Sequence, residues 1–301
     1  MANITPEYIK SQIVEKLSEI GYLADESSKN ALIMAKFTED RELPSDIVES
    51  LLKNIEIASQ RNFPLCQDTG TVVFLVKIGN GFFIDTPKAS VVEYHHEKYI
   101  LETLIYDAVK EAFQINNFRH SIVSDPINRR NTKDNTPPII HYEFTTGDLL
   151  EISMMLKGGG SENMSALKMM IPSDGLTGIR NFVLDTIKKS GSNGCPPLTV
   201  GIGIGGNFET CALLAKKSLF RDFNEINKDE FWANEERYLL NKINQLGIGP
   251  MGLGGKTTAI KVNIEVRPCH IASLPVAVNL ECHAHRIGRL IISNGKLDKN
   301  S

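Results

Sequence analysis

Residues 198–219 read LTVGIGIGGNFETCALLAKKSL, and this stretch decides the fold class of the chain. The apolar run Leu198–Ile204 predicts a buried strand. Phe208–Leu219 carries apolar residues at helical spacing and predicts a helix directly after that strand. Further along, residues 260–267 alternate apolar and polar side chains, which is typical of a half-buried strand. A strand, a helix and a further strand in this order favour a mixed α/β body.

The chain outside this stretch divides into a helical beginning and a mixed remainder. Thr5 and Pro6 suit the first turn of a helix, and apolar residues then recur at helical spacing. Later segments predict the remaining elements: strands at 72–76, 139–144, 149–156, 276–280 and 289–293, helices at 101–112, 175–189 and 229–246, and a loop at 120–138. We therefore expect a mixed α/β (α+β) fold in which residues 1–60 form a helical N-terminal region before an α/β body.

Composition excludes several classes of protein. The chain has 301 residues, 42% hydrophobic and 23% charged, with a formal net charge of −3. That balance argues against a nucleic-acid-binding protein, which normally shows a basic face. No run approaches the roughly 18 apolar residues of a membrane span. The start, MANITPEYIK, lacks the apolar core of a secretory signal, so we expect a cytoplasmic location.

Three glycine clusters raise the question of nucleotide binding. Gly201–Gly206 fits G-x-G-x-x-G, but the helix after it is followed by a polar segment rather than a second buried strand with an acidic end. Close approach of a neighbouring backbone is the alternative explanation for these glycines. Gly254–Thr257 resembles the end of a P-loop but lacks the earlier glycine at the required spacing. Gly158–Gly160 can form either an anion-binding backbone or a plain turn.

The five cysteines do not read as a disulfide framework, because their number is odd and their spacing irregular. Cys66, Cys195 and Cys282 each lie at a strand edge or turn, where sites on α/β scaffolds collect. Cys211 lies within a helix at core spacing, which favours an inert buried thiol. The residues around Cys269 do not indicate a role for it.

Four motifs in order resemble one family over about residues 45–293. They are CQDTG at 66–70, KGGGSEN at 157–163, NGCPP at 193–197 and HIASLPVAVNLEC at 270–282. Together they are similar to class I fumarate hydratases, the iron–sulfur fumarases, in the N-terminal region or separate α subunit. The related L-tartrate dehydratases share this layout. The resemblance implies one fumarase α-type domain over residues 1–301.

The resemblance also implies a cofactor. Three cysteines hold a [4Fe–4S] cluster in that family, and they match Cys66, Cys195 and Cys282. Three thiolates leave one iron without a protein ligand, so that this iron can act as a Lewis acid in hydro-lyase chemistry. His283 and His285 flank Cys282 and can support it through hydrogen bonds.

The family's substrate contacts transfer residue by residue. Gln67 and Asp68 are expected to face the substrate, with Asp68 as the catalytic residue that transfers a proton at the hydroxyl. Arg119 matches an arginine that clamps a carboxylate in bidentate fashion. Gly160 matches a glycine whose backbone approaches the substrate, and His270 matches a substrate-facing histidine. From the residues alone, a turn-forming aspartate and a surface arginine are the ordinary alternatives.

The implied activity is reversible hydration of fumarate to (S)-malate, a step of the tricarboxylic acid cycle. The chain stops where single-chain family members continue into a second domain, so we expect an α subunit that needs a β subunit. An α homodimer within an α2β2 assembly is also implied. L-tartrate dehydratase, with mesaconate as a further substrate to compare, is the nearest alternative. A non-catalytic iron–sulfur sensor is an alternative of another class.

Overall fold

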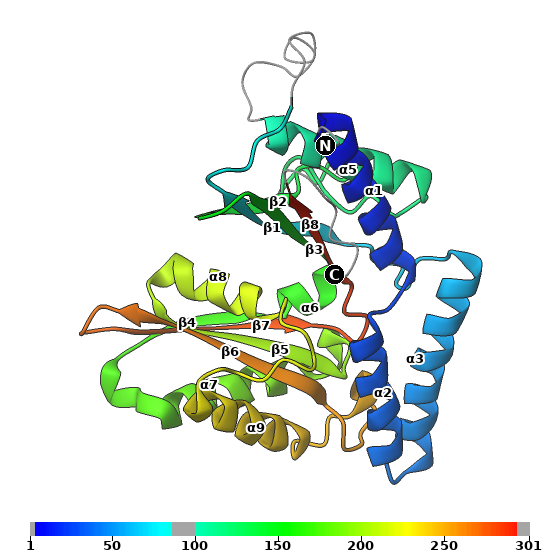
Figure 1. Ribbon diagram of the computed structural model, residues 1–301. Coiled ribbons are helices and arrows are strands. Elements are labelled where there is room, and N and C mark those ends of the chain that lie inside the picture. The colour runs from blue at the N-terminus through cyan, green and yellow to red at the C-terminus, as the bar shows by residue number, and fades with distance from the viewer. Residues whose placement is uncertain (1–3, 86–99, 294–301) are drawn as a thin grey trace. The chain divides into compact units, whose positions relative to one another are not determined.

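The computed structural model describes residues 4–85 and 100–293, and they form two compact units (Figure 1). The first unit comprises Met1–Leu23, Asn62–Lys157 and Arg286–Ser301, and the second comprises Ala24–Arg61 and Gly158–His285. Helices fill the beginning of the chain and mixed sheets with helices follow, which confirms the α+β class. The chain therefore passes from one unit to the other four times.

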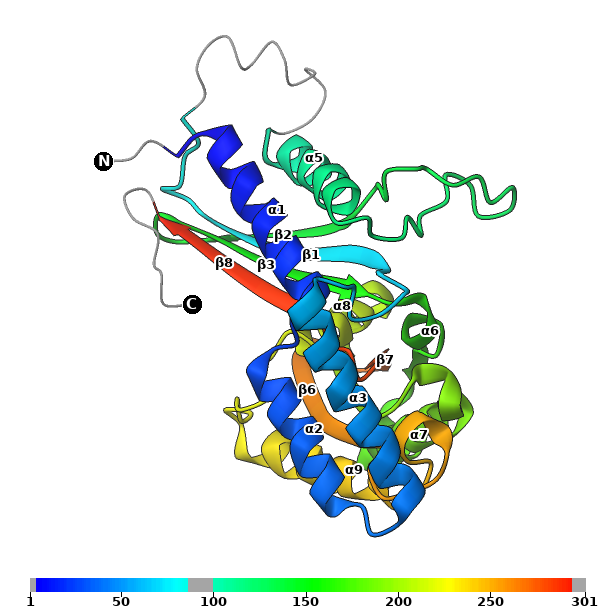
Figure 2. The same cartoon turned by 90° about the vertical axis from the view of Figure 1, so that its right-hand side faces the viewer.

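The first unit is a four-stranded sheet with helices on one face. Its strand order is β2-β1-β3-β8, with β1 parallel to β2 and the other neighbours antiparallel. In Figure 2 both helices lie over the same face of this sheet. The elements are α1 (Pro6–Tyr22), α5 (Ile100–Ile115), β1 (Thr71–Gly79), β2 (Ile139–Thr145), β3 (Leu149–Lys157) and β8 (Ile287–Ser293).

Helix α1 shows why this layer forms. Thr5 caps it by accepting a hydrogen bond from the Tyr8 amide at 3.3 Å, and Pro6 occupies its first turn. Its apolar residues at helical spacing are all buried and pack onto the sheet beside Phe74: Ile9, Ile13, Leu17 and Ile20. Each such burial contributes about 1.5–3 kcal/mol, so the stripe fixes which face of the helix meets the sheet.

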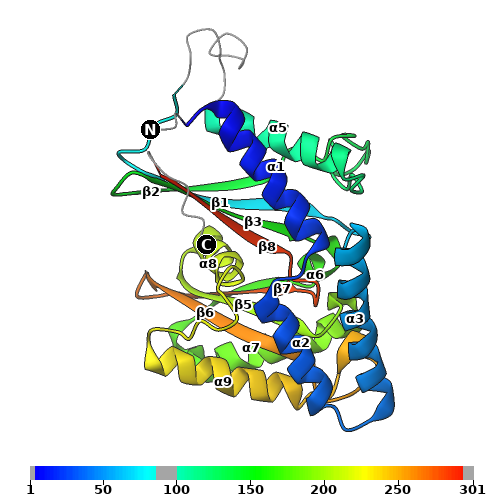
Figure 3. The same ribbon diagram turned by 45° about the vertical axis from the view of Figure 1, so that its right-hand side comes forward.

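The second unit has three layers. Its sheet has the order β4-β7-β5-β6, in which β5 runs parallel to β6 and antiparallel to β7. Figures 1 and 3 show α8 on one face and α7 with α9 on the other. The sheet and its covering helices are β4 (Ala166–Met170), β5 (Leu198–Gly206), β6 (Ala259–Cys269), β7 (Leu274–Glu281), α7 (Gly175–Ser190), α8 (Phe208–Ser218) and α9 (Glu230–Asn244). The unit also contains α2 (Glu26–Thr38), α3 (Glu42–Arg61) and the short α6 (Gly159–Asn163).

The glycines of β5 serve helix packing. A Cβ at Gly201 would lie 2.3 Å from the Ala215 carbonyl oxygen, and one at Gly203 would lie 2.1 Å from that of Cys211. Helix α8 therefore rests directly on the strand backbone. Close approach, rather than a dinucleotide site, is what the G-x-G-x-x-G pattern encodes here.

The P-loop-like segment binds an internal carboxylate. Glu39 accepts hydrogen bonds from the amides of Lys256, at 2.8 Å, and of Thr257, at 2.7 Å. These are the amides that would face a phosphate in a nucleotide site. The turn after Gly254 is thus already occupied by the end of α2.

Most of the expected elements are present, and two differences stand out. Short strand β4 and helix α6 carry no clear periodicity and were not predicted, since Gly158–Gly160 suggested a turn. The N-terminal helices do not stay together either, because α1 belongs to the first unit, and α2 and α3 to the second. Among the described residues, no helix combines the length and the apolar character needed to cross a membrane.

Candidate functional site: two thiol turns and an acid–arginine loop

Cys195 lies in a tight turn that leads into the central strand of the second unit. Helix α7 ends at Ser190 and is capped by Gly191, whose φ is +49°, and one turn of 3-10 helix (Gly191–Gly194) follows. Cys195 itself has a left-handed φ of 56° and donates its amide to the Ser192 carbonyl at 2.9 Å. A left-handed non-glycine residue is uncommon and persists only where its surroundings hold it.

Cys282 lies in a second tight turn at the end of β7. The His285 amide donates to the Cys282 carbonyl at 3.3 Å, and His285 has a φ of 34°. Cys282 is buried, and its thiol contacts a carboxylate oxygen of Glu281 at 3.7 Å. Both predicted ligand turns of this unit therefore contain a residue in the left-handed region.

The two turns are bonded to each other. The His283 amide donates to the Cys195 carbonyl at 3.2 Å, and His283 Nδ1 lies 3.1 Å from the same oxygen. The topology explains this meeting. Cys195 precedes β5 and Cys282 follows β7, and the two strands are antiparallel neighbours, so both cysteines lie at one end of the sheet.

Gly160 lies beside the Cys195 turn. A Cβ at Gly160 would lie 3.4 Å from the Asn193 carbonyl oxygen, so α6 packs against the turn with little room for a side chain. Glu162 of the same helix accepts a hydrogen bond from Asn279 of β7 at 3.3 Å. Gly160, Cys195 and Cys282 thus form one neighbourhood in the second unit.

The first unit brings Asp68 and Arg119 together. Buried Thr69 donates from Oγ1 to the Arg119 carbonyl at 2.7 Å, and Ser121 donates to Asp68 Oδ1 at 3.4 Å. Asn135 joins both segments, because it donates to the Gly70 carbonyl at 3.1 Å and accepts from the Ser121 amide at 2.7 Å. These contacts fix the loop that also carries half-buried Cys66 and exposed Gln67.

Sequence reasoning assigned no role to Thr69, Ser121 or Asn135. The only available signal was the density of turn-forming residues in 120–138. Asn135 is fully buried with a φ of 59°, which a string of turn residues does not reveal.

His270 and Cys282 lie at opposite ends of β7. It is exposed in the connection between β6 and β7, while Cys282 follows the far end of β7. Eight extended residues, Leu274–Glu281, separate the two ends, a span of roughly 26 Å. Within one chain, His270 is therefore separated from the Cys282 turn by the length of β7, and its expected contact with the substrate stays a prediction.

The structure thus brings together two of the three cysteines singled out in the sequence. Cys66 belongs to the first unit, whereas Cys195 and Cys282 belong to the second. Within the described ranges, no group of three or more His, Cys, Asp or Glu side chains is arranged to hold a metal ion. Cys211 is buried in α8 as expected, and burial raises the pKa of its thiol.

Arg286 bears on whether an anionic group fits near the Cys282 turn. It follows His285, is 1% exposed, and its three guanidinium nitrogens have no hydrogen-bond partner in the part of the chain that the structure describes. Arginine stays charged in proteins, and a buried cation without a counter-charge costs several kcal/mol. An iron–sulfur cluster bound by thiolates carries negative charge, so it could serve as the counter-charge that the buried guanidinium lacks. The donor set and the orphaned cation therefore fit the cluster.

The fold and the site define a class: an α+β protein with two joined thiol turns and an acid–arginine loop. Residues 10–290 match the model of the fumarate hydratase (Fumerase) family. The chain belongs to this hydro-lyase family.

Curated relatives cover nearly the whole chain. A Methanocaldococcus jannaschii protein named "Putative L(+)-tartrate dehydratase subunit alpha" is 42% identical over 283 residues, 92% of this chain and 95% of the relative. The L(+)-tartrate dehydratase subunit alpha of Escherichia coli K12 is 32% identical over 294 residues, 94% of this chain and 93% of the relative. A Shigella sonnei protein of the same name matches equally well. The similarity thus extends over nearly the whole length of these α subunits.

Proposed function

We propose that this chain is the α-type subunit of an iron–sulfur hydro-lyase that reversibly hydrates fumarate to (S)-malate. The observation that supports it best is the pair of hydrogen bonds from His283 to the Cys195 carbonyl, which joins two of the proposed cluster-ligand turns. Family membership supplies the reaction class.

In this proposal Cys66, Cys195 and Cys282 hold a [4Fe–4S] cluster. When bound, the cluster supplies a Lewis-acidic iron that favours departure of the substrate hydroxyl. The thiols of Cys195 and Cys282 are on adjoining turns of the second unit, and Cys66 is the third proposed ligand. Buried Arg286 offsets part of the negative charge that the three thiolates bring.

The remaining residues bind substrate and move protons. Arg119 binds one substrate carboxylate through its planar guanidinium. Asp68, held by Ser121, exchanges a proton with the hydroxyl oxygen as it leaves or returns. Gln67 hydrogen-bonds the substrate next to Cys66, and Gly160 lets the backbone approach it because no side chain intervenes.

L-tartrate is the second candidate substrate, because the relatives described above are named tartrate dehydratases. Fumarate hydration and tartrate dehydration need the same parts: a carboxylate clamp, a proton carrier and an acid for the hydroxyl. The second hydroxyl of tartrate distinguishes the two substrates. A site that hydrogen-bonds this hydroxyl would discriminate strongly against malate.

The names of the relatives also support a partner. Each is a "subunit alpha", so we propose that this chain works with a β-type subunit, and that two α-type chains associate in an α2β2 assembly. The partner would supply the second carboxylate clamp and the base that removes the carbon-bound proton.

The test is anaerobic reconstitution of the purified chain with iron and sulfide. We expect about four irons and four sulfides per chain for the wild type and for Cys269→Ser, whose thiol is exposed and outside the site. Cys282→Ser and Cys66→Ser should each lose most of the bound iron. Equal iron binding by all four proteins would overturn the proposal. Turnover of fumarate, L-tartrate and mesaconate by the reconstituted protein with its partner subunit then separates the substrates.

A further inference from the structure

The segment between α8 and α9, residues 219–229, reaches the turn that carries Cys282. We call this segment the 219–229 loop. The Phe223 ring meets the His285 ring edge to face, with centroids 4.8 Å apart and planes at 84°. This geometry is a favoured one for aromatic rings. Phe223 and His285 both belong to the second unit.

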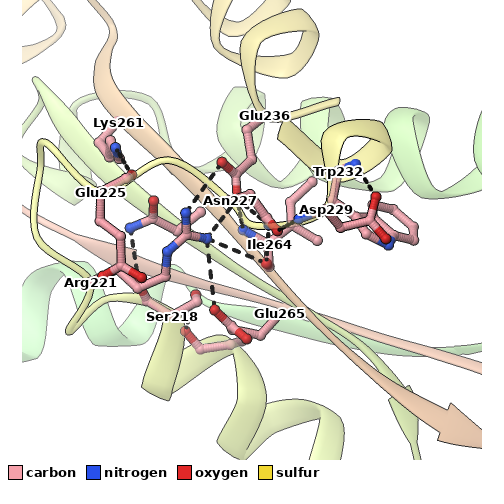
Figure 4. Close-up of polar contacts among 12 residues, drawn as sticks. Ser218, Arg221, Glu225, Asn227, Asp229, Trp232, Glu236, Lys261, Ile264 and Glu265 are labelled. Atoms are coloured by element: carbon pink, nitrogen blue, oxygen red, sulfur yellow. Dashed lines mark hydrogen bonds and ion pairs between the residues drawn. The ribbon is translucent and has the colours of Figure 1, made fainter. Parts of the chain in front are cut away.

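The loop is anchored at a buried carboxylate, as Figure 4 shows. Glu236 of α9 is 7% exposed and accepts hydrogen bonds from Arg221 Nη1 at 2.7 Å and Asn227 Nδ2 at 2.9 Å. The Ile264 amide of β6 donates to the same carboxylate at 2.8 Å. Two loop residues and a strand are thus fixed to one helix, and charge-assisted bonds of this kind are strong.

A second anchor lies at Phe223 itself. Lys261 of β6 donates from Nζ to the Phe223 carbonyl at 2.7 Å. It also donates to the Glu225 carbonyl at 2.9 Å, and Figure 4 shows these two residues side by side. The backbone of Phe223 is therefore hydrogen-bonded to the sheet. This anchor holds the Phe223 ring in position to contact His285.

The contacted turn needs such a support. His285 has a φ of 34°, a region that non-glycine residues rarely occupy and that persists only where surrounding contacts impose it. The turn is held by the backbone hydrogen bond from His285 to Cys282 and by that from His283 to the Cys195 carbonyl. The edge-to-face contact from Phe223 adds a restraint on the side chain of the strained residue.

We infer that Phe223 is a positioning residue, held by Lys261 and the Glu236 anchor, that keeps the Cys282–His285 turn in its folded geometry. The consequence for cluster binding rests on the proposed function. The consequence for the thiol of Cys282 does not, because it concerns the cluster-free chain.

The first experiment measures the alkylation rate of each cysteine in the cluster-free chain by mass spectrometry. Phe223→Ala should label Cys282 about two- to tenfold faster than wild type, the change expected when one aromatic pair no longer restrains local opening. Phe223→Tyr, which keeps the ring, should restore the wild-type rate. Phe231→Ala is the matched control, since this phenylalanine is 52% exposed in α9 and contacts Trp232.

A second variant tests the anchor from another element. Lys261→Met removes the donor to the Phe223 carbonyl while leaving the ring in place, and should also speed labelling of Cys282. The exposed Cys269 reports any change in the reagent. If Cys282 is labelled at the wild-type rate in both Phe223→Ala and Lys261→Met, the inference is wrong.

The reconstituted chain supplies an independent measurement. Phe223→Ala should lose iron and sulfide several-fold faster in air than wild type, whereas Phe231→Ala should not. A wild-type chain that takes up no iron and sulfide would overturn the proposed function and leave the alkylation result to decide on Phe223. A cluster that is equally durable in Phe223→Ala and wild type would overturn the inference alone.

Discussion

Arg119 owes its place to a buried hydroxyl. Thr69 is 1% exposed and donates to the Arg119 carbonyl, while Thr69 itself directly follows Asp68. The backbone of Arg119 is thus bonded to the residue that follows Asp68, the proposed proton carrier. Replacing Thr69 should disturb both together, whereas replacing Arg119 should affect substrate binding alone.

The first prediction concerns the carboxylate clamp. Arg119→Lys keeps the charge but loses the planar fork, so kcat/KM should fall by about 10- to 100-fold, mostly through KM. Arg289→Lys is the control, because Arg289 is exposed on β8 and pairs with Glu151. Steady-state kinetics of the reconstituted complex measures both. Unchanged KM in Arg119→Lys would remove this residue from the substrate site.

The second prediction concerns Arg286. This buried cation has no hydrogen-bond partner among residues 4–85 and 100–293, and replacing it by Met of similar length should stabilise the cluster-free chain by about 1 kcal/mol or more, since a burial penalty disappears. The same change should weaken cluster binding, because the thiolates lose a counter-charge. Urea unfolding of the cluster-free chain and iron content after reconstitution measure the two effects. Destabilisation of the cluster-free Arg286→Met chain would show that the guanidinium already has a partner.

Single residues were foreseeable where local chemistry marks them. Cys195 has glycine before it and two prolines after it, and a turn at this position follows from the residue types. The distance between His270 and Cys282 was harder to foresee. The motif that contains both is continuous in sequence, but eight of its residues form strand β7, which separates its two ends.

At the scale of elements, ion pairs connect three neighbouring strands of the first unit's sheet. Lys77 of β1 and Glu151 of β3 are register partners at 3.1 Å, and Arg289 of β8 contacts the other oxygen of Glu151 at 2.7 Å. Burial alone would raise the pKa of Glu151, but the hydrogen bonds from Arg289 and Lys77 outweigh it and lower this pKa below its ordinary 4.5.

The third prediction follows from the sign of that shift. A carboxyl group whose folded pKa is lowered stabilises the fold above its unfolded pKa and loses this effect as the pH falls through the folded value. Glu151→Gln should therefore lower the free energy of unfolding by about 0.5–1 kcal/mol near neutral pH. The difference from wild type should shrink as the pH falls below 4.5. Urea unfolding across this pH range measures the difference in the free energy of unfolding. Comparison with Lys77→Met and with the double variant gives the interaction energy of the Lys77–Glu151 pair. A difference that grows on acidification would contradict the assignment.

Elements were predictable where periodicity is strong. The stripe of α1 and the alternation in β6 come from side chains that face a core, so composition and position agree. Strand β4 is five residues long at a sheet edge, and α6 begins in consecutive glycines, so neither has enough pattern to be seen. Which strand pairs with which was also hidden, because β8 joins β3 from more than a hundred residues away in sequence.

At the scale of the whole molecule, neither unit is a continuous piece of chain. The first closes its sheet with Ile287–Ser293, and the second recruits residues 24–61 from before the first unit's sheet. Proposed site residues lie close to these passages: Cys66 soon after Arg61, Gly160 after Lys157, and Cys282 shortly before Arg286. Loss of order in either unit would therefore affect ligands at several points in sequence.

The last prediction concerns the partner. A dicarboxylate carries two negative charges, and Arg119 is the only cation among the proposed substrate contacts of this chain, so one carboxylate lacks its clamp. The relatives that match along nearly their whole length are α subunits. We expect the chain alone to take up the cluster yet turn over fumarate or L-tartrate at less than about 1% of the rate of the complex, a loss of the size that removing one charged clamp produces. Anaerobic assays with and without a β-type subunit measure the ratio, and iron content in each sample shows that the cluster is equally present. If the chain alone, with its cluster, works as fast as the complex, then the second clamp and the base lie within this chain, and the division of the site between two subunits has to be given up.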